Sequence, residues 1–146
     1  PEPSTQLDEC IDAISKQKYP HYEVILLPDF PAEPGAFGRF GMEDRLEVIP
    51  TGKIRPAEKR NMGINAARGE IVAFLDDDAF PTDGWLRRAV AYFSDENIAA
   101  VGGPATTPRN DGLLAQLSGR VYASRMVSAG FVYRYIRTCA RGRGLP

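Results

Sequence analysis

Three consecutive carboxylates, Asp76, Asp77 and Asp78, are the residues of this sequence with the clearest capacity for chemistry. They follow the apolar run 71–75 and precede Phe80, so that adjacent like charges lie among apolar neighbours. A divalent cation would offset that cost, because Mg²⁺ and Mn²⁺ prefer hard oxygen ligands and take only a few of them from protein. The triplet is therefore a candidate metal site. A solvated acidic turn is the alternative that the same residues allow.

The position of the triplet at the end of a predicted strand also favours ligand binding. In open α/β sheets, ligands gather at the carboxyl ends of the strands. Along an extended segment, alternation places Asp76 and Asp78 on one side and Asp77 on the other. We therefore expect Asp76 and Asp78 to share one ligand.

Other polar candidates lie on a predicted helix and at the end of an earlier strand. Lys59, Arg60 and Asn61 gather near the start of the helix, where the cations could meet diphosphate or base oxygens and the amide could hydrogen-bond. An ordinary solvated helix face is the alternative. Asp29 closes the predicted strand 24–27, and a carboxylate there could accept hydrogen bonds from a nucleobase or a ribose.

Several other chemistries lack the residues that they need. His21 is the only histidine, lies beside Pro20 in a helix–strand connection, and has no visible serine partner for triad hydrolysis. Neither a Walker loop nor a GxGxxG motif follows a strand, so kinase, GTPase and dinucleotide-binding functions lack a phosphate cradle. Cys10 and Cys139 match no metal-ligand or redox spacing, and we expect two reduced thiols.

The elements that must position these residues alternate between helix and strand. Periodicity and Pro or Gly punctuation predict helices over 5–18, 57–68 and 81–93, strands over 24–27, 46–49, 71–75 and 98–101, and a loop over 28–44. Short continuous apolar runs such as 24–27 are typical of strands buried on both faces. The fold class predicted is α/β, a mostly parallel, doubly wound sheet with helices on both faces.

Composition fits a globular chain with an uneven charge distribution. The 146 residues are 43% hydrophobic and 25% charged, which excludes disordered, collagen-like and disulfide-scaffold classes. No apolar run approaches a membrane span of about 20 residues and no signal peptide is visible, so we expect a cytoplasmic protein. Residues 1–108 carry 11 basic and 18 acidic side chains, whereas residues 109–146 carry seven arginines against Asp111 alone. That basic region could face phosphates, an anionic membrane or nucleic acid, or be merely solvated.

Three segments of the sequence resemble family 2 glycosyltransferases, which have the GT-A fold. The first runs from Leu7 through Gln17-Lys18-Tyr19-Pro20 to Ile25. The second is 59–70 (KRNMGINAARGE), and the third continues it as 71–78 (IVAFLDDD), followed by Pro81 and Gly84-Trp85-Leu86. The continuous stretch 59–86 is far more specific than a lone DXD motif, and the resemblance covers roughly residues 5–105.

The resemblance implies transfer of a sugar, with inversion, from a nucleoside diphosphate donor (UDP-, GDP- or TDP-sugar) to an acceptor hydroxyl on a glycan or lipid-linked molecule. By position, Asp78 and Asp76 resemble the motif's metal-binding residues, Mn²⁺ or Mg²⁺ being the expected cofactor. Asp76 and Asp77 are also expected to face the donor, together with Lys59, Arg60, Asn61 and the base-reading Asp29. We further expect a role in cell-wall or polysaccharide biosynthesis, no nucleic acid partner, and, from the charge of the basic region, its peripheral contact with the cytoplasmic face of a membrane.

The sequence departs from the family pattern at both ends. The family opens with an apolar strand and a nucleotide-lining turn, whereas this chain starts at Pro1-Glu2-Pro3. The catalytic base of the family lies well beyond the DXD motif, and Asp111 is too close to match it. We therefore expect a piece of an enzyme, incomplete at both ends and without its catalytic base, with a nucleotide-sugar-binding domain at 1–108 and the basic, helical or weakly structured start of an acceptor region at 109–146.

Two other function classes stay open on the residues alone. A nucleotidyltransferase-like sugar-nucleotide enzyme would share the strand-end acids but would need a Gly-rich, basic loop after a first strand. A non-catalytic binding or assembly module would use the basic region to dock on a membrane or a partner.

Overall fold

The computed structural model describes residues 5–108, 111–128 and 134–135, and it divides into two compact units, Pro1–Asp95 and Glu96–Pro146. Of the seven arginines of the basic region, Arg109, Arg137, Arg141 and Arg143 lie outside the described residues, as does Cys139. The functional division at residue 108 stays a prediction. None of the helices in the described part of the chain has both the length and the apolar character that crossing a bilayer requires.

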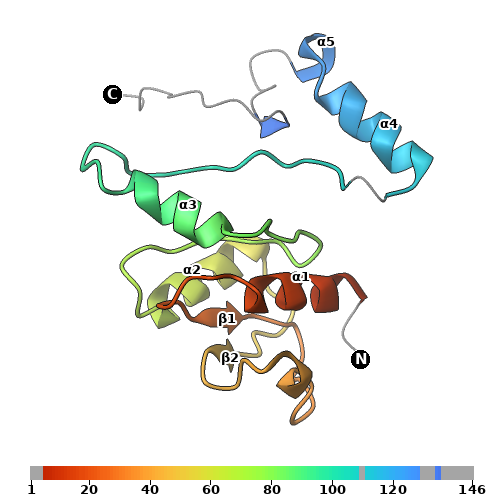
Figure 1. Cartoon of the computed structure of the whole chain (residues 1–146). Coiled ribbons are helices and arrows are strands. Elements are labelled where there is room, and N and C mark those ends of the chain that lie inside the picture. Colours follow the sequence, from red (N-terminus) through yellow and green to blue (C-terminus); the bar gives the residue numbers. More distant parts are fainter. Residues whose placement is uncertain (1–4, 109–110, 129–133, 136–146) are drawn as a thin grey trace. The chain divides into compact units, whose positions relative to one another are not determined.

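The elements of both units are shown in Figure 1. The first unit contains α1 (Thr5–Ser15), β1 (Val24–Leu26), the 3₁₀ helix η1 (Gly38–Phe40), β2 (Leu46–Val48), α2 (Pro56–Ala66) and α3 (Trp85–Tyr92). The second unit contains α4 (Leu113–Tyr122) and α5 (Arg125–Ser128). Helices together with a parallel strand pair make the fold α/β, in agreement with the predicted class and with an incomplete GT-A fold.

The strands β1 and β2 pair in parallel, as predicted, but their residues are half-buried or, at Glu47, exposed, and are not buried on both faces. Val24, Ile25 and Leu26 lie opposite Leu46, Glu47 and Val48. Beyond the strands, the backbone N–H of Ile49 donates to Leu26 O at 2.9 Å, and that of Thr51 donates to Pro28 O at 2.9 Å. This pairing fixes the chain just before Asp29, so that the end of β1 is a rigid support for a side chain.

The buried core of the first unit lies under α1. The helix predicted over 5–18 is observed over Thr5–Ser15, with Cys10 and Ile11 buried, and Met42 from the loop after η1 is buried as well. Gln17 is the buried polar residue of the described chain, at 6% exposure. Its amide donates to Ala13 O and Thr82 O and accepts from the backbone N–H of Leu86. Gln17 therefore ties the end of α1 to the start of α3.

The helix α2 begins with Pro56, directly before the predicted span 57–68, and ends at Ala66, earlier than predicted. Pro56 occupies the first turn, and the backbone N–H of Arg55 donates to Glu58 Oε2 at 3.4 Å. At the other end, the N–H of Arg68 donates to Glu23 Oε1 at 2.7 Å instead of to a helix carbonyl. The Arg68 guanidinium also binds Glu23, and these hydrogen bonds lower the pKa of the Glu23 carboxyl. The backbone N–H and the guanidinium of Arg68 both bind Glu23, and Arg68 lies outside the helix.

Two predicted strands and one helix start differ in the structure. The segments 71–75 and 98–101 are not strands, because a strand needs a neighbour to supply its ladder hydrogen bonds, and neither segment pairs with a described residue. Accordingly, Val72 and Phe74 are 40% and 53% exposed, although the prediction had them buried. The helix predicted from residue 81 begins only at Trp85, because Gly84 has a φ of +67° and interrupts the helical backbone.

The second unit is held by contacts around α4. The backbone N–H of Ala105 donates to Arg134 O at 2.6 Å, and the rings of Tyr122 and Tyr135 stack with centroids 5.5 Å apart. In the region 109–146, which we expect to be helical or weakly structured, the described residues form the helices α4 and α5.

Candidate functional site

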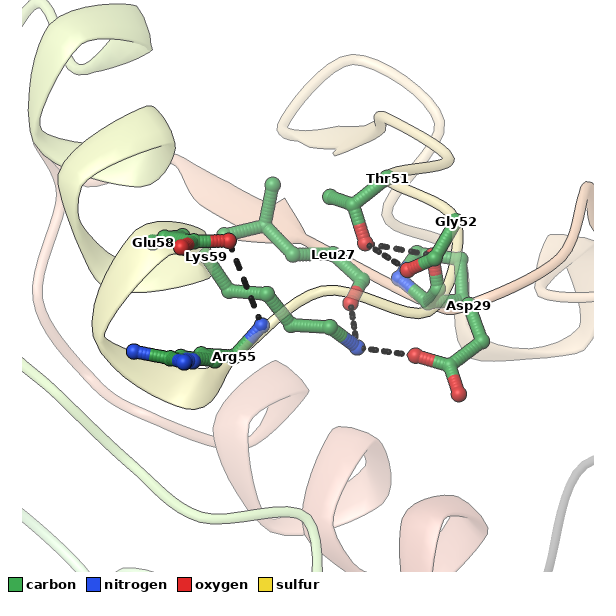
Figure 2. A network of polar contacts seen from close by, with 8 residues as sticks. Leu27, Asp29, Thr51, Gly52, Arg55, Glu58 and Lys59 are labelled. Carbon is green, nitrogen blue, oxygen red and sulfur yellow. Dashed lines mark hydrogen bonds and ion pairs between the residues drawn. The ribbon is translucent and has the colours of Figure 1, made fainter.

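The helix α2 places two adjacent cations against two different acidic residues. The first is Lys59, whose Nζ lies 2.6 Å from Asp29 Oδ1 and 3.1 Å from the Leu27 carbonyl oxygen (Figure 2). The Lys59 side chain is 24% exposed, and that of Asp29 is 40% exposed. Lys59 thus connects α2 to the end of β1 by a charged hydrogen bond and a backbone contact.

The second cation, Arg60, reaches the acidic triplet. Its Nη2 lies 3.3 Å from Asp76 Oδ1, and both side chains are exposed. Since residues 59 and 60 are consecutive, α2 bridges the two segments that the sequence predicted to read the base and to hold the metal. The structure therefore brings Asp29, Lys59, Arg60 and Asp76 into one region of the first unit. Asn61 is exposed on the same helix.

The backbone of the triplet forms a turn. The N–H of Ala79 donates to Asp76 O at 3.0 Å, which closes a four-residue turn around Asp77 and Asp78. Asp76 and Asp78 therefore do not lie on one side of an extended segment, and that prediction is wrong. All three carboxylates are exposed.

A buried thiol lies directly beneath the triplet. Cys10 Sγ of α1 is 3.8 Å from Asp76 O, and the residue is 5% exposed. Burial, followed by the charges of Asp77 and Asp78, raises the pKa of Cys10 from 9.0 to about 11. The thiol is thus protonated at neutral pH. The negative charges of Asp77 and Asp78 therefore act on a buried side chain of α1.

The donor chemistry of the triplet suits a hard divalent cation, because all its side chains offer carboxylate oxygens. Among the residues that the structure describes, no group of three or more His, Cys, Asp or Glu side chains is arranged to enclose a metal ion. The metal assignment therefore rests on the type and exposure of these oxygens and on Arg60, which already neutralises part of their charge.

An open hollow beside Asp29 is lined in part by residues that the sequence did not indicate as site residues. It has a volume of about 720 Å³ and is lined by Asp29, Lys53, Ile54, Arg55 and Glu58. Lys53 Nζ lies 5.7 Å from the centre of the Phe30 ring, and Thr51 Oγ1 is within hydrogen-bond distance of both the Pro28 and Gly52 carbonyl oxygens. The signal that could have indicated this hollow is the pair of basic residues Lys53 and Arg55 shortly before Pro56, where α2 begins.

A second hollow, of about 410 Å³, lies under the loop after β1 and contains none of the predicted site residues. Its lining is mostly apolar, from the loop 31–38 and from β2. We therefore place the candidate site at the hollow beside Asp29 and at the triplet, on either side of α2.

Comparison with known proteins finds a matching family model and several similar proteins. The family model described as "Glycosyl transferase family 2" matches residues 2–139. The chain is 33% identical over 104 residues to Glycosyltransferase AglE of Haloferax volcanii, covering 66% of this chain and 34% of that protein. It is 29% identical over 99 residues to Uncharacterized glycosyltransferase EpsJ of Bacillus subtilis, covering 66% of this chain and 29% of that protein.

A shorter match is with Pre-mycofactocin glycosyltransferase of Mycobacterium tuberculosis, 44% identical over 46 residues, which are 32% of this chain and 10% of that protein. The chain thus spans about a third or less of the length of these relatives. No solved structure matches it.

Proposed function

Because this chain belongs to glycosyl transferase family 2, we propose that its first unit binds a nucleoside diphosphate sugar as the donor for transfer to an acceptor hydroxyl. The observation that carries the proposal is the pair of contacts from α2, Lys59 to Asp29 and Arg60 to Asp76. They support one continuous site in which a base-reading acid and a phosphate-facing acid flank the same helix.

In this proposal the base lies at the hollow beside Asp29. One oxygen of Asp29 is held by Lys59, which leaves the other oxygen to accept a hydrogen bond from the base or the ribose. Lys53 and Arg55 line the same hollow and supply positive charge there. Lys59 therefore acts on the donor mainly by orienting Asp29, whereas Arg60 and Asn61 face it from the exposed side of α2.

The diphosphate lies at the triplet, with Asp78 and Asp76 as the residues that would hold Mn²⁺ or Mg²⁺ and Asp77 beside them. A bound cation would offset the charge that builds on the leaving diphosphate. Arg60 would contribute to the same electrostatic balance once the donor separates it from Asp76. The carboxylate chemistry of the turn supports this assignment.

The reaction is proposed to proceed with inversion, as in the family that the sequence resembles, with a glycan or lipid-linked acceptor in cell-wall or polysaccharide biosynthesis. The general base stays unassigned. A cytoplasmic location, with the basic region 109–146 at the inner face of a membrane, belongs to the same proposal and is supported by the excess of arginine there.

The direct test is isothermal titration calorimetry of the folded chain with UDP-, GDP- and TDP-sugars in the presence of Mn²⁺. We expect heat of binding with donors of one base, since Asp29 reads the base. Well-folded protein that gives no heat with any of these donors would contradict the proposal. Binding of a nucleoside triphosphate with turnover to a sugar nucleotide would instead favour the nucleotidyltransferase alternative.

A further inference from the structure

The helix α4 of the second unit presents its leucines to solvent. Leu113, Leu114, Leu117 and Val121 are 75%, 81%, 47% and 52% exposed. On a helix with 3.6 residues per turn, these four positions fall within an arc of about 100°. The following helix, α5, also exposes an apolar side chain, Met126, at 95%. Exposed apolar side chains gathered on one helical face mark an interaction surface rather than scattered surface residues.

The opposite face of α4 makes the contacts within the unit. Gln116 Nε2 donates to the Pro108 carbonyl oxygen, and Gly119 lies so close to Thr107 that a Cβ there would overlap its side chain. The small and polar side of α4 thus packs on the segment before it. An amphipathic helix in a globular protein packs the other way round, with its leucines inward.

The charges beside this face indicate the partner. Arg120 is exposed on α4, on the helical wheel next to Leu113, and no acidic residue occurs after Asp111. The region 109–146 carries seven arginines against that single acid. A second copy of the chain would bring like charges together, whereas an anionic bilayer offers acyl chains to the leucines and phosphates to the arginines.

We propose that α4 and α5 lie in the surface of an anionic phospholipid bilayer, with Leu113, Leu114, Leu117 and Met126 at the boundary between headgroups and acyl chains. The inference identifies the element that makes the peripheral membrane contact included in the proposed function. It does not depend on donor binding, because every residue that carries it belongs to the second unit. An acceptor anchored in the same lipid surface would then be presented to the enzyme by this docking.

The test is co-sedimentation of the chain with vesicles of phosphatidylcholine and phosphatidylglycerol, and with vesicles of phosphatidylcholine alone. We expect binding to the anionic vesicles that weakens as salt is raised. The double substitution Leu114→Ser with Leu117→Ser should weaken it at least tenfold, because two exposed leucines leave the interface. Arg120→Gln should weaken it about fivefold at low salt.

The matched control is Met62→Ser with Ile64→Ser, an exposed apolar pair on α2 of the first unit, at 38% and 46% exposure. It should bind vesicles as the unchanged chain does. Circular dichroism shows whether each variant keeps its helices. Failure to bind anionic vesicles, or equal loss in both double variants, overturns the proposal.

Self-association offers a competing outcome. If sedimentation velocity shows dimers that Leu114→Ser with Leu117→Ser dissolves, while vesicles are not bound, the face belongs to a second copy and the lipid proposal is wrong. Donor calorimetry on the same variants separates the two proposals. If the chain binds the donor but not vesicles, only the membrane proposal is wrong. If it binds vesicles but not the donor, only the donor-site proposal is wrong.

Discussion

Lys59 and Arg60 differ in their surroundings although they are neighbours on α2. Lys59 is mostly enclosed, with its ammonium bound to Asp29 and to the Leu27 carbonyl, whereas the Arg60 side chain is 51% exposed. A partly buried ion pair fixes the geometry of a carboxylate better than an exposed pair does, since water competes less. We therefore assign Lys59 to positioning and Arg60 to direct contact with the donor.

Substitution of Lys59 tests that assignment. Lys59→Met keeps the aliphatic stem but removes the ammonium that holds Asp29, so donor affinity should fall about tenfold, the loss of one charge-assisted hydrogen bond at Asp29. The control is Lys16→Met, which removes the exposed i,i+4 pair with Asp12 on α1. Calorimetry with the preferred donor measures both variants. Equal donor affinities for the two would show that Lys59 does not position Asp29.

Cys10 gives a prediction for the dependence of stability on pH. Because folding raises its pKa from 9.0 to about 11, the folded state keeps the proton over a range where the unfolded state loses it. The stabilisation is complete below pH 9 and is lost as the pH rises towards 11, a change of about 2–3 kcal/mol. Urea unfolding at pH 8 and pH 10.5 should show this loss.

Cys10→Ala serves as the comparison. The variant lacks the buried thiol, so its free energy of unfolding should fall less between the two pH values than that of the unchanged chain. Parallel curves for both proteins would mean that Cys10 does not ionise differently on unfolding.

At the scale of the elements, Gln17 holds α1 and α3 together. It is buried at 6% exposure and satisfies the Thr82 carbonyl and the Leu86 N–H, which belong to the turn before α3 and to α3 itself. The motif Gln17-Lys18-Tyr19-Pro20 supported the family resemblance. In the structure its glutamine is buried and hydrogen-bonded to the segment that begins α3.

Removing that amide should destabilise the first unit. Gln17→Leu leaves the part-buried Leu86 N–H without its partner and removes the second donor to the Thr82 carbonyl, which still accepts from the Trp85 N–H, at a cost of about 1–3 kcal/mol. Gln6→Leu is the matched change at an exposed position of α1 and should alter stability by less than about 0.5 kcal/mol. Urea unfolding midpoints measure both. A Gln17→Leu midpoint equal to that of Gln6→Leu would refute the bridging role.

The elements differ in how far the sequence predicted them. The helices predicted over 5–18 and 57–68 depend on local signals, apolar periodicity and Pro or Gly punctuation, and α1 and α2 confirm both. The apolar run 71–75 also has a strand pattern, but pattern alone cannot supply a neighbouring strand, and the segment is exposed without one among the described residues. An acidic turn was the alternative that the residues of the triplet left open, and the backbone hydrogen bond from Ala79 to Asp76 that closes it does not follow from the residue pattern.

The same distinction applies to the candidate site. Residue types at strand ends and at a helix start identified Asp29, Lys59, Arg60 and the triplet. Which cation meets which acid follows only from the packing of α2 between the two segments. The hollow beside Asp29 was not predicted. Lys53 and Arg55 reach it because the chain turns at Gly52, which has a φ of +72°, and apolar periodicity does not reveal such a turn.

At the scale of the whole molecule, the two units carry separable properties. All residues proposed to bind the donor lie in Pro1–Asp95, and the apolar face proposed to bind lipid lies in Glu96–Pro146. Donor binding and membrane binding should therefore be lost independently. The chain covers 34% of AglE and 29% of EpsJ, so activity of the complete protein is a proposal that extends beyond these residues.

The metal dependence of donor binding tests the central claim most directly. Calorimetric titration of the preferred nucleotide sugar is carried out with Mn²⁺ and with EDTA, on the unchanged chain, on Asp78→Ala and on the control Asp12→Ala, whose side chain on α1 is 47% exposed. We expect binding that requires Mn²⁺, that Asp12→Ala retains, and that Asp78→Ala weakens at least a hundredfold, because it removes a charged metal ligand. Donor binding of equal strength in EDTA, or unchanged in Asp78→Ala, would contradict the assignment of the triplet.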